Sequence, residues 1–146
     1  MEKTRDGEMI LVIDTNIVIA AIIKPSVTQS LILKEELELY SPEFLKDEIE
    51  KHRSAILKKT GYTKEEFEII ISIVYSNITI IPGKEYKHLK KEILSFAPDE
   101  KDWPFLALAK HLGAGLWSND SELKNQNETR VITTGDLIQV LKKKIK

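Results

Sequence analysis

Four acidic residues lie at separated points of the chain, each where an α/β fold would direct its side chain toward one place. Asp14 and Asp120 follow short apolar runs expected to be strands, whereas Glu48 and Asp102 belong to predicted helices. Clustered carboxylates repel one another, so a fold that gathers them needs a strong counter-charge. The chain has no Cys and only 3 widely separated His, so the favoured counter-charge is a hard divalent cation, Mg²⁺ or Mn²⁺.

Carboxylates that hold such a cation suit the hydrolysis of a phosphodiester, because the metal activates water and stabilises negative charge on the phosphate. In the absence of the cation, at least one of these carboxylates should have a raised pKa. We therefore expect Asp14→Asn to abolish activity while folding is kept or improved. Five neighbouring residues are expected to position these acids or contact the substrate: Thr15, Asn16, Asp99, Ser118 and Asn119. Of these, Asp99 is also able to assist or replace Asp102.

Each acid taken alone also has a structural interpretation. Asp14, at a strand end, can satisfy backbone donors, and Asp102 can cap the helix that it precedes. Asp120 lies in a Ser/Asn/Asp cluster typical of turns, and Glu48 lies in a charged stretch that solvent can cover. The hypothesis of a common site rests on the four positions as a set.

Composition indicates one soluble globular domain that spans residues 1–146, with a core over roughly 9–141. Its 42% hydrophobic and 31% charged residues leave no sign of disorder, and the lack of Cys fits a reducing compartment. No apolar run is long enough for a signal peptide or a membrane span, so we expect a cytoplasmic protein without a membrane partner. The net charge of −1 gives no global attraction for nucleic acid, although local lysines can still contact phosphates.

Strand and helix patterns alternate along the chain, which is typical of parallel βα units. Residues 9–13 form a continuous apolar run, as expected for a strand buried on both faces. Thr63 and Glu66 form a capping box at the start of one helix, and Thr134 is placed to cap the last one. The remaining elements follow from apolar spacing, Pro and Gly: strands at 38–41, 78–81, 114–118 and 130–133, and helices at 16–23, 29–37, 43–59, 84–96 and 103–112.

These elements predict an α/β fold with a five-stranded, mostly parallel sheet covered by helices on both sides. In such sheets the ligand site lies beyond the carboxyl ends of the strands, where Asp14 and Asp120 are expected. Glu48 points inward if the face that carries Leu45 and Ile49 packs on the sheet, and Asp102 reaches the site if its turn folds over from the next layer.

The residues that carry this argument resemble the PIN domain family, a small nuclease fold found in RNA-processing factors and in VapC-type toxins. The resemblance covers roughly residues 9–141 and rests on Val12–Asn16, on Glu48, on Asp102 with Phe105–Ala109, and on Leu116–Asp120. Glu48 is the weakest match because Asp47 and Glu50 compete for its role. Ser118 stands where PIN families often carry Thr or Ser.

Membership of this family implies a three-layer α/β/α sandwich and a Mg²⁺- or Mn²⁺-dependent ribonuclease with an RNA substrate. It also implies frequent homodimers and, for a VapC-type toxin, an antitoxin protein as partner. Ile22, Leu31 and Ile32 on two early helices belong either to such an interface or to the core. The alternative function is a PIN-like module that binds RNA or protein without cutting.

Other enzyme classes match less well. Haloacid-dehalogenase-type phosphatases carry a second Asp two residues after the first, where this chain has Asn16, and receiver domains carry an acidic pair that residues 9–13 do not supply. Trp103 and Trp117 flank acidic positions, so each either stacks on a nucleic-acid base or packs in the protein. A lysine group, with the basic tail at 142–146, is either a set of phosphate contacts or a solvated surface: Lys84, Lys87, Lys90 and Lys91.

Overall fold

A computed structural model describes residues 9–24 and 26–145 of the chain. The described residues contain a five-stranded sheet in the order β3-β2-β1-β4-β5, and every neighbouring pair is parallel. The α/β fold predicted from the sequence is therefore confirmed, with a sheet that is parallel throughout. The strands are β1 (Met9–Ile13), β2 (Leu37–Pro42), β3 (Ile78–Ile81), β4 (Gly115–Trp117) and β5 (Val131–Ile132).

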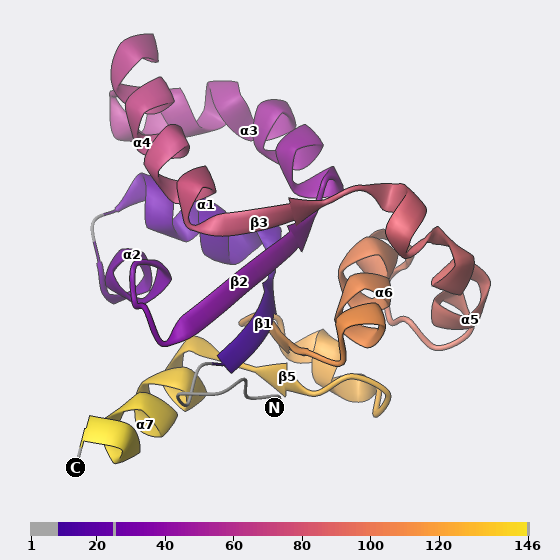
Figure 1. Cartoon of the computed structure of the whole chain (residues 1–146). Coiled ribbons are helices and arrows are strands. Elements are labelled where there is room, and N and C mark those ends of the chain that lie inside the picture. The colour runs from indigo at the N-terminus through magenta and orange to yellow at the C-terminus, as the bar shows by residue number, and fades with distance from the viewer. Residues whose placement is uncertain (1–8, 25, 146) are drawn as a thin grey trace.

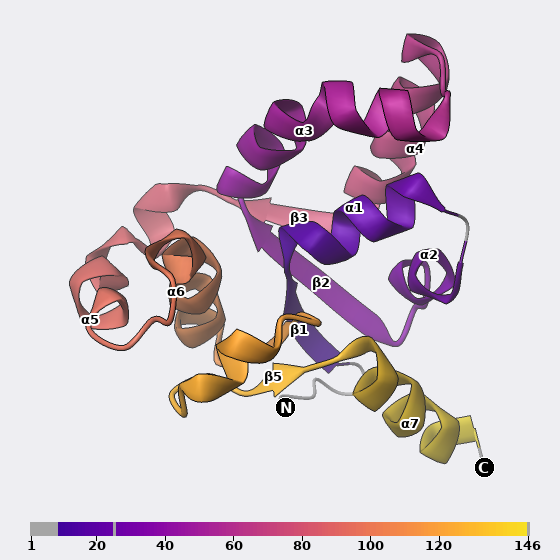
Figure 2. The same cartoon turned by 180° about the vertical axis from the view of Figure 1, so that it is seen from behind.

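Helices cover both faces of the sheet and give three layers. One side carries α1 (Thr15–Ile23), α2 (Val27–Ile32), α3 (Phe44–Thr60), α4 (Lys64–Ser76) and α7 (Thr134–Ile145). The other side carries α5 (Lys90–Leu94) and α6 (Trp103–Leu112). Figures 1 and 2 show α5 and α6 together, away from α3 and α4. Short 3₁₀ turns complete the connections: η2 (Gly83–Glu85), η3 (Lys87–Leu89), η4 (Glu100–Asp102) and η5 (Ser121–Asn125).

The central strand β1 explains this layering. Successive side chains of a strand point to opposite faces, so Leu11 and Ile13 pack in the core beneath α1 and α3, whereas Val12 packs in the core beneath α6. All three side chains are fully buried. An unbroken apolar run is therefore what this position requires, and Asp14, the first polar residue after it, ends the strand.

The largest difference from the sequence prediction lies in residues 84–96, for which one helix was expected. The structure has η2, η3 and only the short α5 there. Tyr86, with a φ of −128°, separates the two 3₁₀ turns, and its ring is buried against Trp103. The helix predicted at 29–37 is shifted as well, because α2 spans Val27–Ile32. Tertiary packing of Tyr86 therefore overrides a local preference that was correct only for residues 90–94.

The helix cap predicted from the sequence is found at the start of α4 but not at the start of α7. The capping box predicted at the start of α4 is present, with Thr63 Oγ1 accepting from the Glu66 backbone N–H and Glu66 accepting from that of Thr63. At α7 the cap is Thr133 rather than Thr134, since Thr133 Oγ1 accepts the N–H of Asp136 at 3.0 Å. Thr134 instead accepts a hydrogen bond from the indole of Trp117.

The three apolar residues of the early helices that were considered for an interface belong to the core. Ile22, Leu31 and Ile32 are 0%, 5% and 3% exposed, so they are core residues and not an exposed apolar patch. Within the described ranges, no helix combines the length and apolar character needed to cross a membrane.

The packing of α6 on the sheet predicts a sharp difference between two apolar substitutions. Leu106 is fully buried, and Leu106→Ala should lower the free energy of unfolding by about 2–5 kcal/mol through lost burial and a residual cavity. Ile69 is 61% exposed, and Ile69→Ala should change it by less than about 0.5 kcal/mol. Urea denaturation followed by circular dichroism measures both, and equal losses would contradict the assigned packing.

Candidate active site at the carboxyl edge of the sheet

Asp14 lies between the carboxyl ends of two neighbouring strands. It follows β1 directly, and its backbone N–H donates to the carbonyl of Trp117, the last residue of β4. Its carboxylate Oδ2 accepts the hydroxyl of Ser118 at 2.8 Å. Ser118 is fully buried, and its Oγ also accepts the backbone N–H of Asp120 at 3.1 Å. One serine therefore links two of the acids predicted from the sequence.

Glu48 approaches from the helical layer above the sheet. Leu45 and Ile49 of α3 are fully buried, and this helical phase turns Glu48 toward the start of α1. There the hydroxyl of Thr15 donates to Glu48 Oε1 at 2.5 Å. The competing acids of α3 lie elsewhere: Asp47 lines a neighbouring groove, and Glu50 pairs with Arg53 on the surface.

Asp102 completes the set from the opposite layer. It ends η4 immediately before α6, and its side chain makes no capping hydrogen bond to that helix. The capping role considered for it is therefore wrong. Asp99, three residues earlier, does use its carboxylate locally, because Oδ1 accepts the N–H of Lys101.

The remaining predicted residues divide into two kinds. Asp120 makes the turn that its local sequence indicates, since Oδ1 accepts the N–H of Glu122 at 3.0 Å. Asn119 accepts the N–H of Thr134 and so joins the loop after β4 to the start of α7. Asn16 is exposed on the first turn of α1. Asn119 is thus a structural tether, whereas Asp120 combines a turn with a position beside Asp14.

One supporting residue was not singled out from the sequence. Ser41, near the end of β2, is fully buried and donates to the carbonyl of Ile13 at 3.1 Å. This hydrogen bond fixes the last peptide group of β1 before Asp14. A polar residue at the carboxyl end of a predicted strand is the signal that would have identified it.

The pKa values of two carboxyl groups show that the acids interact. Burial raises the pKa of Asp14, the Ser118 hydroxyl and the Thr15 backbone N–H lower it, and the charges of Glu48 and Asp120 raise it again. Burial first, and then repulsion from Asp14, Asp99, Asp120 and Glu48, together raise the pKa of Asp102 to about 7. The raised pKa expected of a cation-free site is therefore present at two of the four acids.

The donor chemistry fits a hard divalent cation, because the converging side chains supply carboxylate oxygens. Within residues 9–24 and 26–145, however, no three His, Asp or Glu side chains are placed closely enough to hold one metal ion together. The acids therefore repel one another across a shared space without forming a ready-made cage. To hold one cation together, three of these carboxylates would have to lie closer than they do in this structure.

The sequence matches the PIN domain family over residues 12–134. The chain belongs to the PIN domain family. A solved structure with the same fold is that of VapBC2 from Rickettsia felis bound to a DNA fragment from their promoter. That likeness has a TM-score of 0.64 at 20% sequence identity and covers 86% of this chain and 98% of the other. Among curated proteins, no sequence matches this chain. The recognition made from the sequence is confirmed, as is the three-layer fold that it implied.

The pKa of Asp102 leads to a prediction about stability and pH. Its value of about 7 in the folded protein exceeds the ordinary value of 3.8, so between these pH values the folded state binds more protons than the unfolded state. The free energy of unfolding of the metal-free protein should therefore fall as pH rises through this window. Asp102→Asn should reduce that fall and raise stability at pH 8 by about 1 kcal/mol, a figure discounted for partial exposure.

Denaturation at pH 5 and pH 8, with and without Mg²⁺, measures this effect. Glu35→Gln, which neutralises an exposed carboxylate at the other end of the sheet, is the matched control and should follow the wild type. Saturating Mg²⁺ should stabilise the wild type more at pH 8 than at pH 5, because binding requires ionised carboxylates. Parallel pH profiles for wild type and Asp102→Asn would refute the assignment.

Proposed function

We propose that this PIN domain protein is a metal-dependent endoribonuclease that hydrolyses phosphodiester bonds of RNA at the carboxyl edge of its sheet. The observation that carries the proposal is the electrostatic coupling of Asp14 and Asp102 with Glu48 and Asp120, in a chain of this family. Acids that repel one another raise the free energy of the fold, so a structural role does not account for their convergence. A bound cation does, because it offsets that repulsion.

Asp14, Asp102 and Asp120 would hold Mg²⁺ or Mn²⁺, with Glu48 acting directly or through water. When bound, such a cation supplies Lewis acidity for water activation and charge neutralisation at the phosphate. The residues of the chain orient the site. Ser118 holds the Asp14 carboxylate and the loop of Asp120, and the hydrogen bond from Thr15 fixes Glu48.

Removing one carboxylate tests the proposal directly. Asp14→Asn should lower Mn²⁺- or Mg²⁺-dependent cleavage of labelled single-stranded RNA by roughly 100-fold or more, because charge and ligand are lost together. Its thermal stability without metal should stay the same or rise, since a buried charge is removed. Glu35→Gln again serves as the carboxylate-to-amide control and should cleave at the wild-type rate. EDTA should abolish cleavage by the wild type and by Glu35→Gln.

The second candidate function is a PIN-like module that binds RNA or a protein without cleavage. The same assay separates the two functions: metal-independent RNA binding with no cleavage by the wild type would favour the module. Cleavage that survives in Asp14→Asn would remove Asp14 from the proposed site.

We also propose a cytoplasmic location, because the absence of Cys suits a reducing compartment that contains RNA.

We propose in addition that α2 and α4 form a protein-binding face for an antitoxin-type partner. Unlike the buried residues that were first considered, four large apolar side chains on this face are at least half exposed. They are Val27, Leu33, Ile69 and Ile73. An apolar cavity of about 210 Å³ lies between the two helices, lined by Ile32, Leu33, Ile70, Ile73 and other residues. Exposed apolar patches of this kind mark interaction surfaces. A homodimer is the other occupant to be tested.

Light scattering of the purified chain alone distinguishes these occupants. Ile73→Lys places a charge on the apolar face, and Asn127→Lys adds the same charge at an exposed polar position away from it. A monomeric wild type leaves the face available for an antitoxin-type partner. A dimer that dissociates in Ile73→Lys and persists in Asn127→Lys assigns the face to a second copy. A dimer unaffected by either substitution would contradict dimerisation through this face.

A further inference from the structure

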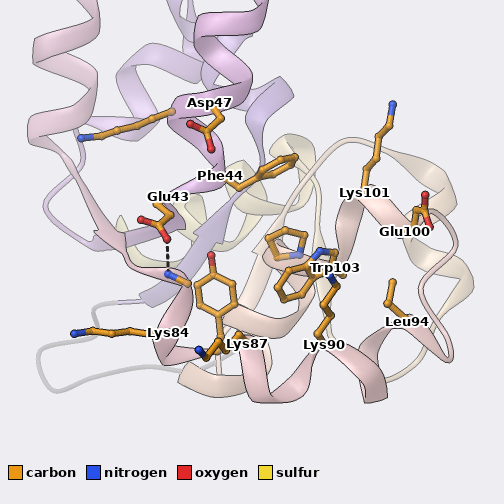
Figure 3. Close-up of a pocket in the computed structure, with 14 residues that line it drawn as sticks. Glu43, Phe44, Asp47, Lys84, Lys87, Lys90, Leu94, Glu100, Lys101 and Trp103 are labelled. Carbon is orange, nitrogen blue, oxygen red and sulfur yellow. Dashed lines mark hydrogen bonds between the residues drawn. The ribbon is translucent and has the colours of Figure 1, made fainter.

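A groove of about 920 Å³ lies beside the acidic site. Residues next in sequence to two of the acids line it. Its walls are the start of α3, the segment of η2, η3 and α5, and the start of α6 (Figure 3). Asp47 lines the groove while its neighbour Glu48 faces the site, and Trp103 lines it while its neighbour Asp102 faces the site. The groove and the acids therefore share two segments of backbone. A ligand strand bound in the groove would lie next to the acids.

The groove carries an excess of positive charge. Lysines outnumber acids among its lining residues, five to three. Lys84, Lys87 and Lys90 are exposed and come from the segment that faces Asp47 across the groove in Figure 3. In the described part of the chain, the cations of the ion pairs are Arg53, Lys110 and Lys124, so these three lysines are not among them.

Among the described residues, the three acids of the groove form no ion pair with its lysines. Glu43 accepts the backbone N–H of Gly83 at 2.7 Å, which fixes η2 against the start of α3. Asp47 stands at the wall nearest Glu48, and Glu100 lies in η4. The three lysines on the η2–α5 segment therefore remain available for anionic groups such as phosphates.

Aromatic rings line the floor of the same groove. Phe44, Tyr86 and Trp103 all contribute, and the Trp103 and Tyr86 ring centroids are 5.8 Å apart. Lys90 Nζ lies 5.0 Å from the centroid of the partly exposed Trp103 ring. A cation–π contact at a solvent-exposed site is weaker than the stacking of a nucleic-acid base on the same ring. A base can therefore displace Lys90 from the indole, which frees that ammonium for the adjoining phosphate.

We propose that this groove is the RNA-binding track of the enzyme: it holds a single strand with one base stacked on Trp103 and phosphates on Lys84, Lys87 and Lys90. The proposal rests on the proposed ribonuclease function. An unpaired strand fits because its bases are free to stack on side chains, whereas the bases of a duplex are stacked on one another. The neighbouring acids alone would repel RNA, so a cationic track beside them supplies the attraction that the net charge of −1 does not.

Binding without cleavage tests the track itself. In an Asp14→Asn background, fluorescence anisotropy follows a fluorescein-labelled, unstructured RNA of about 12 nucleotides. Lys84→Gln/Lys87→Gln/Lys90→Gln should weaken binding by about tenfold or more and reduce the slope of log K against log salt by about 2. The control Lys58→Gln/Lys59→Gln/Lys64→Gln removes the same charge from exposed positions at the far end of α3 and the start of α4, and should bind like the parent.

The stacking contact has its own spectroscopic readout. The chain has two tryptophans, and Trp117 is fully buried, so quenching of tryptophan fluorescence by RNA reports on Trp103. Trp103→Leu, which keeps an apolar side chain against Tyr86, should lose that quenching and bind RNA about tenfold more weakly. Its salt dependence should be unchanged, because no cation is removed. A circular dichroism melt of each variant checks that the fold is kept.

The outcomes separate this inference from the proposed function. If the wild type cleaves RNA through Asp14 while the lysine and Trp103→Leu variants bind and cleave normally, the track is wrong and the nuclease stands. If the wild type binds but never cleaves and both variants lose binding, the track stands and the nuclease fails. Equal losses from the two triple variants would reduce the effect to net charge and overturn the track. Tight binding of a duplex in preference to the single strand would also overturn it.

Discussion

The constraint on which this molecule depends is the partial burial of the Asp14 carboxylate at the end of its central strand. Removing a charge from water is costly unless hydrogen bonds replace the lost solvation. Ser118 provides such a bond, and it does so only because β1 and β4 pair in parallel with Ile13 opposite Trp117. That register places the residues following both strands side by side. The sheet therefore determines the site, and a slip of one residue would turn Ser118 away.

Much of the fold was readable from the sequence because apolar pattern and buried layer correspond directly. The unbroken run at 9–13 predicts a strand covered on both faces, and the Leu45/Ile49 phase of α3 separates Glu48 from Asp47 and Glu50. The segment 84–96 shows where this reasoning fails. Its lysines are good helix formers, but the burial of Tyr86 against Trp103, seventeen residues away in sequence, breaks the helix into turns. No local pattern contains that contact.

The same distinction applies to the site. Asp14 and Asp120 were predictable because the carboxyl ends of parallel strands meet at one edge of the sheet. Asp102 was predicted only conditionally, since its local sequence equally suits a helix cap. The tertiary position of η4 decides between the two roles. It leaves the Asp102 carboxylate without a capping hydrogen bond to α6 and close to the other acids. The loop after β4 was more ambiguous: Asp120 makes a turn and also lies beside Asp14, so the turn is confirmed and does not exclude the proposed role in the site.

Net charge conceals the most consequential feature of this surface. Acidic and basic residues nearly cancel over the whole chain, yet the fold sorts them: acids gather at the edge of the sheet, and lysines line the groove beside them. Screening at physiological salt acts over about 8 Å, so a strand bound as we propose would respond to these local fields and not to their sum. Adjacent residues do the sorting, because Asp102 and Trp103 face opposite sides of one turn. With the function and the track that we propose, this arrangement would make cation binding a condition for bringing a phosphate close to the acids.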